Sequence, residues 1–139
     1  MDYFIPIVGK DALSYFREVC TDFDYAIIPY YEAYHLVREV KELRELNPDI
    51  KLILSSIMPD EYLEKPETLK YFVKYAEEVG FDYILVWDLP TYLDDMEERW
   101  RNTRKSIEVI SSLKHKFKVI PLVKGAYPEQ KRYACEELN

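Results

Sequence analysis

Five short apolar runs, each followed by a segment with helical periodicity, constrain the fold of this 139-residue chain more than any other feature. The runs have the length of strands, whereas the segments between them place apolar residues three and four positions apart. The predicted strands are Phe4–Val8, Tyr25–Tyr30, Lys51–Ile57, Tyr83–Trp87 and Val119–Val123. Near-continuous apolar strands that alternate with helices indicate a parallel sheet buried on both faces.

Capping and turn residues separate these elements. Pro66 is suited to the first turn of a helix and Gly80 to the position after its last turn. The acids Asp94-Asp95 lie near the start of the longest helix, where negative charge complements the helix dipole. Asp11 as N-cap, Pro66 and Pro128 are expected to begin three of the helices. A further helix buries Ala33, Leu36, Val37, Val40 and Leu43, and the longest carries apolar residues from Leu93 to Ile110.

Residues 1–139 therefore form one α/β domain of five consecutive βα units, for which two architectures fit. One is a partial TIM-type (β/α) barrel, and the other is a doubly wound five-stranded parallel sheet. The length alone favours the open sheet. However, the turn Val8-Gly9-Lys10-Asp11 has a single glycine, which is too few for the phosphate-binding turn typical of doubly wound nucleotide folds.

Composition narrows the classes of function and location. The net charge of −7 opposes a general nucleic-acid-binding role, and Lys114–Lys118 is the only basic cluster. No apolar stretch approaches the length of a membrane span, and the N-terminus lacks the features of a signal peptide, so we expect a cytoplasmic protein. Cys20 and Cys135 suggest neither a disulfide nor a zinc site, and we expect no metal or cofactor. Thirteen tyrosines beside many charged residues would suit a thermophile.

Polar or aromatic residues follow the predicted strands at the end where parallel α/β proteins bind ligands. Asp88 comes directly after the apolar strand Tyr83–Trp87 and is the first candidate for a ligand-binding group, although it could instead cap the turn before the next helix. The pair Tyr30-Tyr31 could stack on a base or cover the rim of the sheet. The complete set is Tyr30-Tyr31, Ser55-Ser56, Asp88 with Pro90, and Lys124-Gly125.

Three segments resemble the tRNA-guanine transglycosylases and their relatives that insert 7-deazaguanines into DNA. The segment "YILVWDLPTY" (83–92) is similar to the family's strand that ends in a base-reading aspartate, and the helix after it has the family's "R…S" spacing. The segment "PLVKGAYPEQKRYACEEL" (121–138) resembles the family's "VQGG…E.LR…A..L" strand, turn and helix. The segment "YAIIPYYEAY" (25–34) resembles a tyrosine-rich strand end of the DNA-modifying branch.

This resemblance implies a role for each matching residue. Asp88 would accept hydrogen bonds from the edge of guanine, and Gly125 would let the base approach the backbone. Lys124 stands where the family usually has glutamine, and Ser55 stands where the family has an aspartate. The nucleophilic aspartate and the zinc site lie beyond the part of the family that the chain covers, so the resemblance assigns no catalytic residue here.

The resemblance therefore implies a partial barrel that binds a purine base at its carboxyl strand ends and is catalytically incomplete or partner-dependent in queuosine- or archaeosine-type nucleic acid modification. Open edges on β-strands would favour a homodimer or a complex with a second chain. Two other functions stay open. One is a small hydrolase or lyase that uses Asp88 and Lys124 as an acid-base pair, and the other is a non-enzymatic assembly module.

Overall fold

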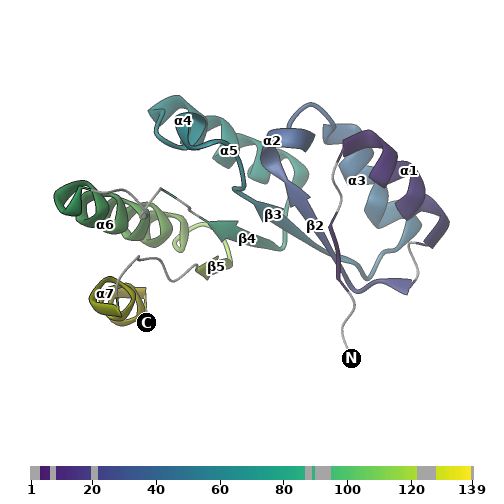
Figure 1. Cartoon of the computed structure of the whole chain (residues 1–139). Helices are drawn as coiled ribbons and strands as arrows, with labels where there is room; N and C mark the ends of the chain where they lie inside the picture. The colour runs from purple at the N-terminus through teal and green to yellow at the C-terminus, as the bar shows by residue number, and fades with distance from the viewer. Residues whose placement is uncertain are drawn as a thin grey trace.

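The protein is an α/β domain in which strands and helices alternate along the chain (Figure 1). The structure is a computed structural model that describes residues 4–6, 9–19, 22–86, 89, 95–121 and 128–138. The strands are β1 (Phe4–Pro6), β2 (Tyr25–Pro29), β3 (Lys51–Ser55), β4 (Tyr83–Val86) and β5 (Val119–Pro121). The helices are α1 (Gly9–Val19), α2 (Tyr30–Ala33), α3 (Val37–Leu46), α4 (Asp60–Leu63), α5 (Pro66–Val79), α6 (Met96–Leu113) and α7 (Pro128–Leu138).

All five strands are parallel and form one sheet in the order β1-β2-β3-β4-β5. The predicted parallel α/β fold is thus confirmed. A doubly wound sheet needs a point at which the strand order reverses. The order of the described strands contains no such reversal, so the doubly wound alternative is wrong.

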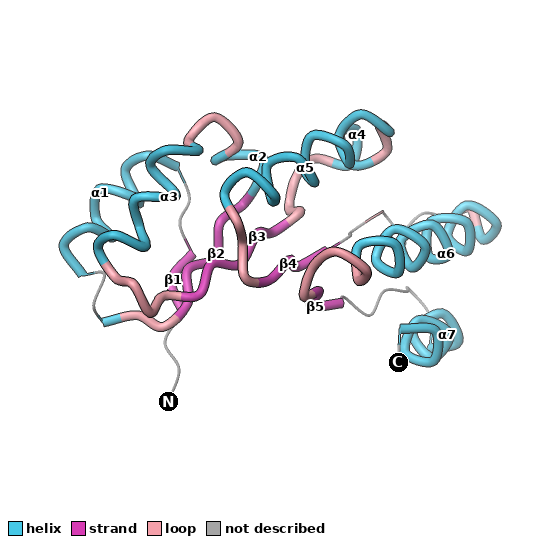
Figure 2. The backbone as a smooth tube through the Cα atoms, turned by 180° about the vertical axis from the view of Figure 1, so that it is seen from behind, coloured by secondary structure: helices cyan, strands magenta, loops and turns pink. Residues whose placement is uncertain are grey.

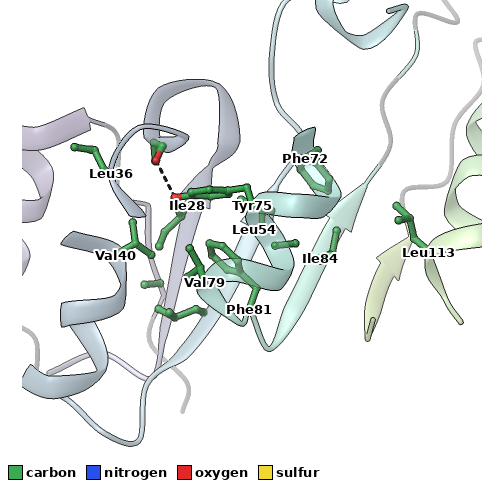
Figure 3. Packing of buried hydrophobic residues seen from close by; sticks show 14 of the residues in the cluster. Ile28, Leu36, Val40, Leu54, Phe72, Tyr75, Val79, Phe81, Ile84 and Leu113 are labelled. Carbon is green, nitrogen blue, oxygen red and sulfur yellow. Dashed lines mark hydrogen bonds between the residues drawn. The ribbon is translucent and has the colours of Figure 1, made fainter. Parts of the chain in front are cut away.

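The main core lies between one face of the sheet and the helices α1, α3, α5 and α6, which Figures 1 and 2 show on the same side of the strands. Ile28, Leu54 and Ile84 are neighbours across β2, β3 and β4, and each is fully buried. Figure 3 shows them beside Phe72 and Val79 of α5. Burying each such side chain contributes about 1.5–3 kcal/mol, which makes this layer the main source of stability.

The segment after β2 differs from the single helix expected to bury Ala33 through Leu43. Two helices occur instead, and Leu36 between them has non-helical dihedrals of φ −108° and ψ 44°. The Ala33 carbonyl accepts hydrogen bonds from the Tyr75 hydroxyl (2.8 Å) and from Leu36 N–H (2.9 Å). Because these donors occupy the carbonyl, the helical hydrogen-bond pattern stops there. Tyr30, expected to end the strand, is instead the first residue of α2.

Several predicted helix boundaries hold and others shift. Pro66 begins α5, and Gly80 ends it in the left-handed conformation at φ 77°. Helix α1 begins at Gly9, so Asp11 lies in its first turn and is not the N-cap. Leu93, expected as the first apolar residue of the longest helix, lies outside the described residues. Asp95 is the N-cap of α6, and its carboxylate accepts a hydrogen bond from Glu98 N–H at 3.0 Å.

Arg44 connects three elements at the end of the sheet opposite the candidate site. Its guanidinium donates to the Val79 carbonyl (3.1 Å), to the Gly80 carbonyl and to the Asp82 carboxylate (3.1 Å). The same Asp82 oxygen accepts a hydrogen bond from Leu52 N–H at 2.8 Å. The contact therefore joins α3, the C-terminus of α5 and strand β3. None of the described helices is both long and apolar enough to span a membrane.

Candidate functional site

The sequence-predicted site residues fall into two groups. Asp88, Lys124 and Gly125 lie outside the described residues. Tyr30 and Ser55 are described and lie at the carboxyl ends of β2 and β3. The structure therefore bears on two of the five predicted ligand-binding residues.

Ser55 has a local structural role at the end of β3. Its side chain is fully buried, and its Oγ accepts a hydrogen bond from Ile57 N–H at 3.3 Å. The strand neighbour of Ser55 is Leu85, whose carbonyl accepts a hydrogen bond from Ser56 N–H at 3.1 Å. These contacts shape the turn that leaves the strand.

Tyr30 joins the core to the surface at the adjacent strand end. Its ring meets Phe72 and Tyr75 edge-on, with centroid distances of 5.4 and 5.6 Å. The centroid of the Tyr34 ring lies 5.9 Å from that of Tyr30, with the rings tilted by 42°. Burial, and then the neighbouring phenols of Tyr34 and Tyr71, raise the pKa of Tyr30 above its ordinary value, so the hydroxyl stays protonated at neutral pH. Tyr30 thus covers the rim of the core and also faces a cleft.

This cleft, called the tyrosine cleft below, has a volume of about 750 Å³. It lies where β2 and β3 end and is bounded by α2, the segment after β3, α4 and the first part of α5. The residues that line it are Tyr30, Tyr31, Glu32, Tyr34, His35, Met58, Tyr62, Lys65, Glu67, Thr68 and Tyr71. Five of these eleven are tyrosines, which makes the walls aromatic while each ring presents a polar hydroxyl.

Two elements far apart in sequence place a pair of rings in this cleft. The rings of Tyr31 on α2 and Tyr62 on α4 lie 5.4 Å apart at an angle of 46°. The Lys65 ammonium lies 5.0 Å from the centroid of the Tyr62 ring, within the range of a cation–π contact. The nearby Tyr62 phenol is the main cause that raises the pKa of Tyr31, with a smaller contribution from burial. Tyr31 is therefore a neutral phenol at physiological pH, able to donate and to accept hydrogen bonds.

Further polar groups surround the rings. His35 stands edge-on to Tyr34 with a centroid distance of 5.3 Å, and Glu32 and Glu67 contribute carboxylates to the lining. Within the described part of the chain, no three His, Cys, Asp or Glu side chains group as metal ligands do. The cleft can thus offer flat apolar surface, neutral hydroxyls, one ammonium and two carboxylates.

Sequence reasoning found Tyr30 and Tyr31 but missed Tyr62, Lys65 and Tyr71. These three belong to the segment between β3 and β4, in which only the helix from Pro66 was expected. The unused signal for Tyr62 was the segment Asp60-Glu61-Tyr62-Leu63, which forms the short helix α4 between β3 and α5.

No protein-family model matches this chain, and no curated protein matches its sequence.

Proposed function

We propose that this protein binds a planar, purine-like base in the tyrosine cleft, on a partial (β/α) barrel related to the guanine transglycosylases. The observation that carries the proposal is the gathering of five tyrosines around a cleft of about 750 Å³ at the carboxyl ends of β2 and β3. Ligand pockets commonly have volumes of about 300–1,000 Å³ and lie at this end of parallel sheets.

The aromatic walls favour a flat ring as the ligand. A base stacked on an aromatic side chain gains about 1–3 kcal/mol, and this gain needs no particular base identity. Tyr31 and Tyr34 suit such stacking because their side chains are exposed within the lining, at 41% and 56%. They retain accessible ring surface that a ligand can cover.

The polar groups favour a purine edge over a purely apolar ring. A guanine edge presents both N–H donors and a carbonyl acceptor, and the cleft offers the Glu67 carboxylate for the donors and the Lys65 ammonium for the acceptor. The overall charge of −7 disfavours a polyanionic ligand, which makes a free base or a nucleoside the better candidate.

The sequential order of the parallel strands supports the partial barrel, because successive strands are neighbours throughout a (β/α) barrel. The proposed role is base binding, because no residue of this chain is assigned as a catalytic nucleophile. Asp88 would add the base-reading carboxylate that the resemblance implies, and it lies outside the described residues.

Isothermal titration calorimetry of the purified chain with guanine and with 7-deazaguanine tests the proposal. We expect saturable binding that Tyr31→Ala and Tyr62→Ala each weaken by about tenfold, as the loss of one stacking partner predicts. Tyr15→Ala is the matched control, because Tyr15 lies on α1, is 57% exposed and does not line the cleft. Absence of binding, or equal affinity in the Tyr62→Ala protein, would refute the proposal.

The same titration separates stacking from edge recognition. Asp88→Asn should weaken binding by about 2 kcal/mol if this carboxylate reads the base edge. Unchanged affinity in that variant, together with weaker binding by Tyr62→Ala, would assign recognition to the tyrosine cleft alone.

A further inference from the structure

The tyrosine cleft already holds a cation against one of its rings, and the protein itself supplies that cation. The Lys65 ammonium lies 5.0 Å from the centroid of the Tyr62 ring, and both residues line the cleft. A face of this ring is therefore accessible to a cation from within the cleft. Lys65 is exposed and precedes the first residue of α5, so a ligand can displace its flexible side chain at little cost.

A second ring meets Tyr62 at an angle that suits a cation. The Tyr31 ring lies 5.4 Å from it with an interplanar angle of 46°, so the two rings form a corner and not a flat stack. Cations bind within about 6 Å of a ring centroid, where they face the negative surface of the π system. Tyr30 and Tyr34 form a similarly tilted pair in the same cleft, 5.9 Å apart at 42°. The cleft therefore offers several ring faces at angles to one another.

Negative charge surrounds these rings. Among the lining residues, Glu32 and Glu67 provide two carboxylates and Lys65 one ammonium. The neighbouring phenol and then burial are the largest causes that raise the pKa of Tyr31, and the charge of Glu61 adds to them, so a third carboxylate acts on the same ring. The whole chain carries a net charge of −7. The local and the overall charge thus both favour a cationic ligand over an anionic one.

We propose that the tyrosine cleft binds a methylated ammonium group, such as the trimethylammonium group of choline or of a modified lysine side chain. Such a cation donates no hydrogen bonds, so ring faces and nearby carboxylates can stabilise it without a fixed set of acceptors. A primary ammonium has three donors and is strongly hydrated, so it would need acceptors that ring faces do not supply. The inference adds a second class of ligand and does not require that the cleft binds guanine. Both ligands would use the faces of Tyr31 and Tyr62, so they should exclude each other.

Isothermal titration calorimetry of the full chain with choline tests the proposal. The comparison ligand is the neutral alcohol in which a carbon replaces the quaternary nitrogen of choline, because it has the same shape and no charge. We expect choline to bind at least about tenfold more tightly than this alcohol. The comparison uses the unmodified chain, so it does not depend on the folding of any variant. Equal affinities, or no saturable binding of choline, would overturn the proposal.

Two substitutions in the cleft should change the affinity for choline in opposite directions. Tyr62→Ala removes one ring of the corner and should weaken binding by about tenfold, whereas Tyr15→Ala, on α1 and outside the cleft, should have no effect. Lys65→Met removes the competing ammonium and should strengthen binding by about threefold. Weaker binding by Lys65→Met, or equal effects of Tyr62→Ala and Tyr15→Ala, would contradict the proposal.

The Lys65 variant also separates this inference from the proposed base binding. The same substitution should weaken guanine binding, because the ammonium would no longer donate to the guanine carbonyl. Choline binding without guanine binding would support the cation site and refute the base site, and the reverse result would overturn the cation site alone. A peptide that contains trimethyllysine, titrated beside choline, identifies the source of the cation, since the natural source should resemble the tighter of the two probes.

Discussion

Replacing Tyr75 by phenylalanine removes one buried hydroxyl from the core next to Tyr30, and we expect it to lower the free energy of unfolding by about 1 kcal/mol. The hydroxyl donates to the Ala33 carbonyl at 2.8 Å, and both residues are buried. A buried carbonyl left with no donor would cost up to about 3 kcal/mol. Here Leu36 N–H donates to the same oxygen at 2.9 Å, so the carbonyl keeps a partner and the smaller value applies.

Urea denaturation followed by circular dichroism measures this difference. Tyr71→Phe is the matched control, because Tyr71 lies on the same helix and its side chain is 58% exposed. The control should stay within about 0.5 kcal/mol of the unmodified chain. Equal stabilities of the two variants would refute the role of the hydrogen bond, and a loss well above 3 kcal/mol would show that Leu36 does not compensate.

Three further predictions concern the same scaffold. Arg44→Met should lower the free energy of unfolding in urea by about 2 kcal/mol, because it removes three partly screened hydrogen bonds. Arg38→Met should lower it by less than about 0.5 kcal/mol, since Arg38 makes one exposed ion pair. Equal losses in the two variants would contradict this prediction. Burial raises the pKa of Tyr75 above 10.0, so the folded state retains a proton that the unfolded state releases. The contribution of Tyr75 to the free energy of unfolding should therefore be complete below about pH 10 and decrease above it. The free energy of unfolding should fall more steeply with pH in the unmodified chain than in Tyr75→Phe, and parallel pH profiles of the two proteins would refute this. Gly80→Ala should lower the free energy of unfolding by about 1 kcal/mol and lower the melting temperature. The cause is the positive φ of 77° alone, because the added Cβ meets no atom closer than 3.9 Å. An unchanged melting temperature would exclude backbone strain at this position.

The parts of the fold that the sequence predicts best are those with a local physical cause. An apolar run such as Tyr83–Trp87 needs burial on a sheet, and the observed strand occupies most of that run. Pro66 and Gly80 mark their helix ends through their own backbone preferences, whatever surrounds them. The order of strands in the sheet has no such local cause, because it depends on how the crossover connections pack. Both candidate architectures have the same alternation of strands and helices, so the sequence did not distinguish between them.

The tyrosine cleft shows what sequence reasoning could not supply. Tyr31 and Tyr62 are separated by strand β3 in the chain, and only the three-dimensional packing of α2 against α4 brings their rings together. The helix break after Ala33 likewise depends on Tyr75, which lies 42 residues later. Periodicity within a short window does not detect such long-range donors.

The sequential strand order also affects how the chain can acquire its structure during synthesis. Each strand pairs with the one made just before it, over 21 residues from Phe4 to Tyr25 and 35 residues from Ile84 to Val119. No described strand waits for a distant later partner, so each loop to be closed is short and its entropic cost modest. As the chain emerges from the ribosome one βα unit at a time, each new strand can pair with a strand that is already part of the sheet.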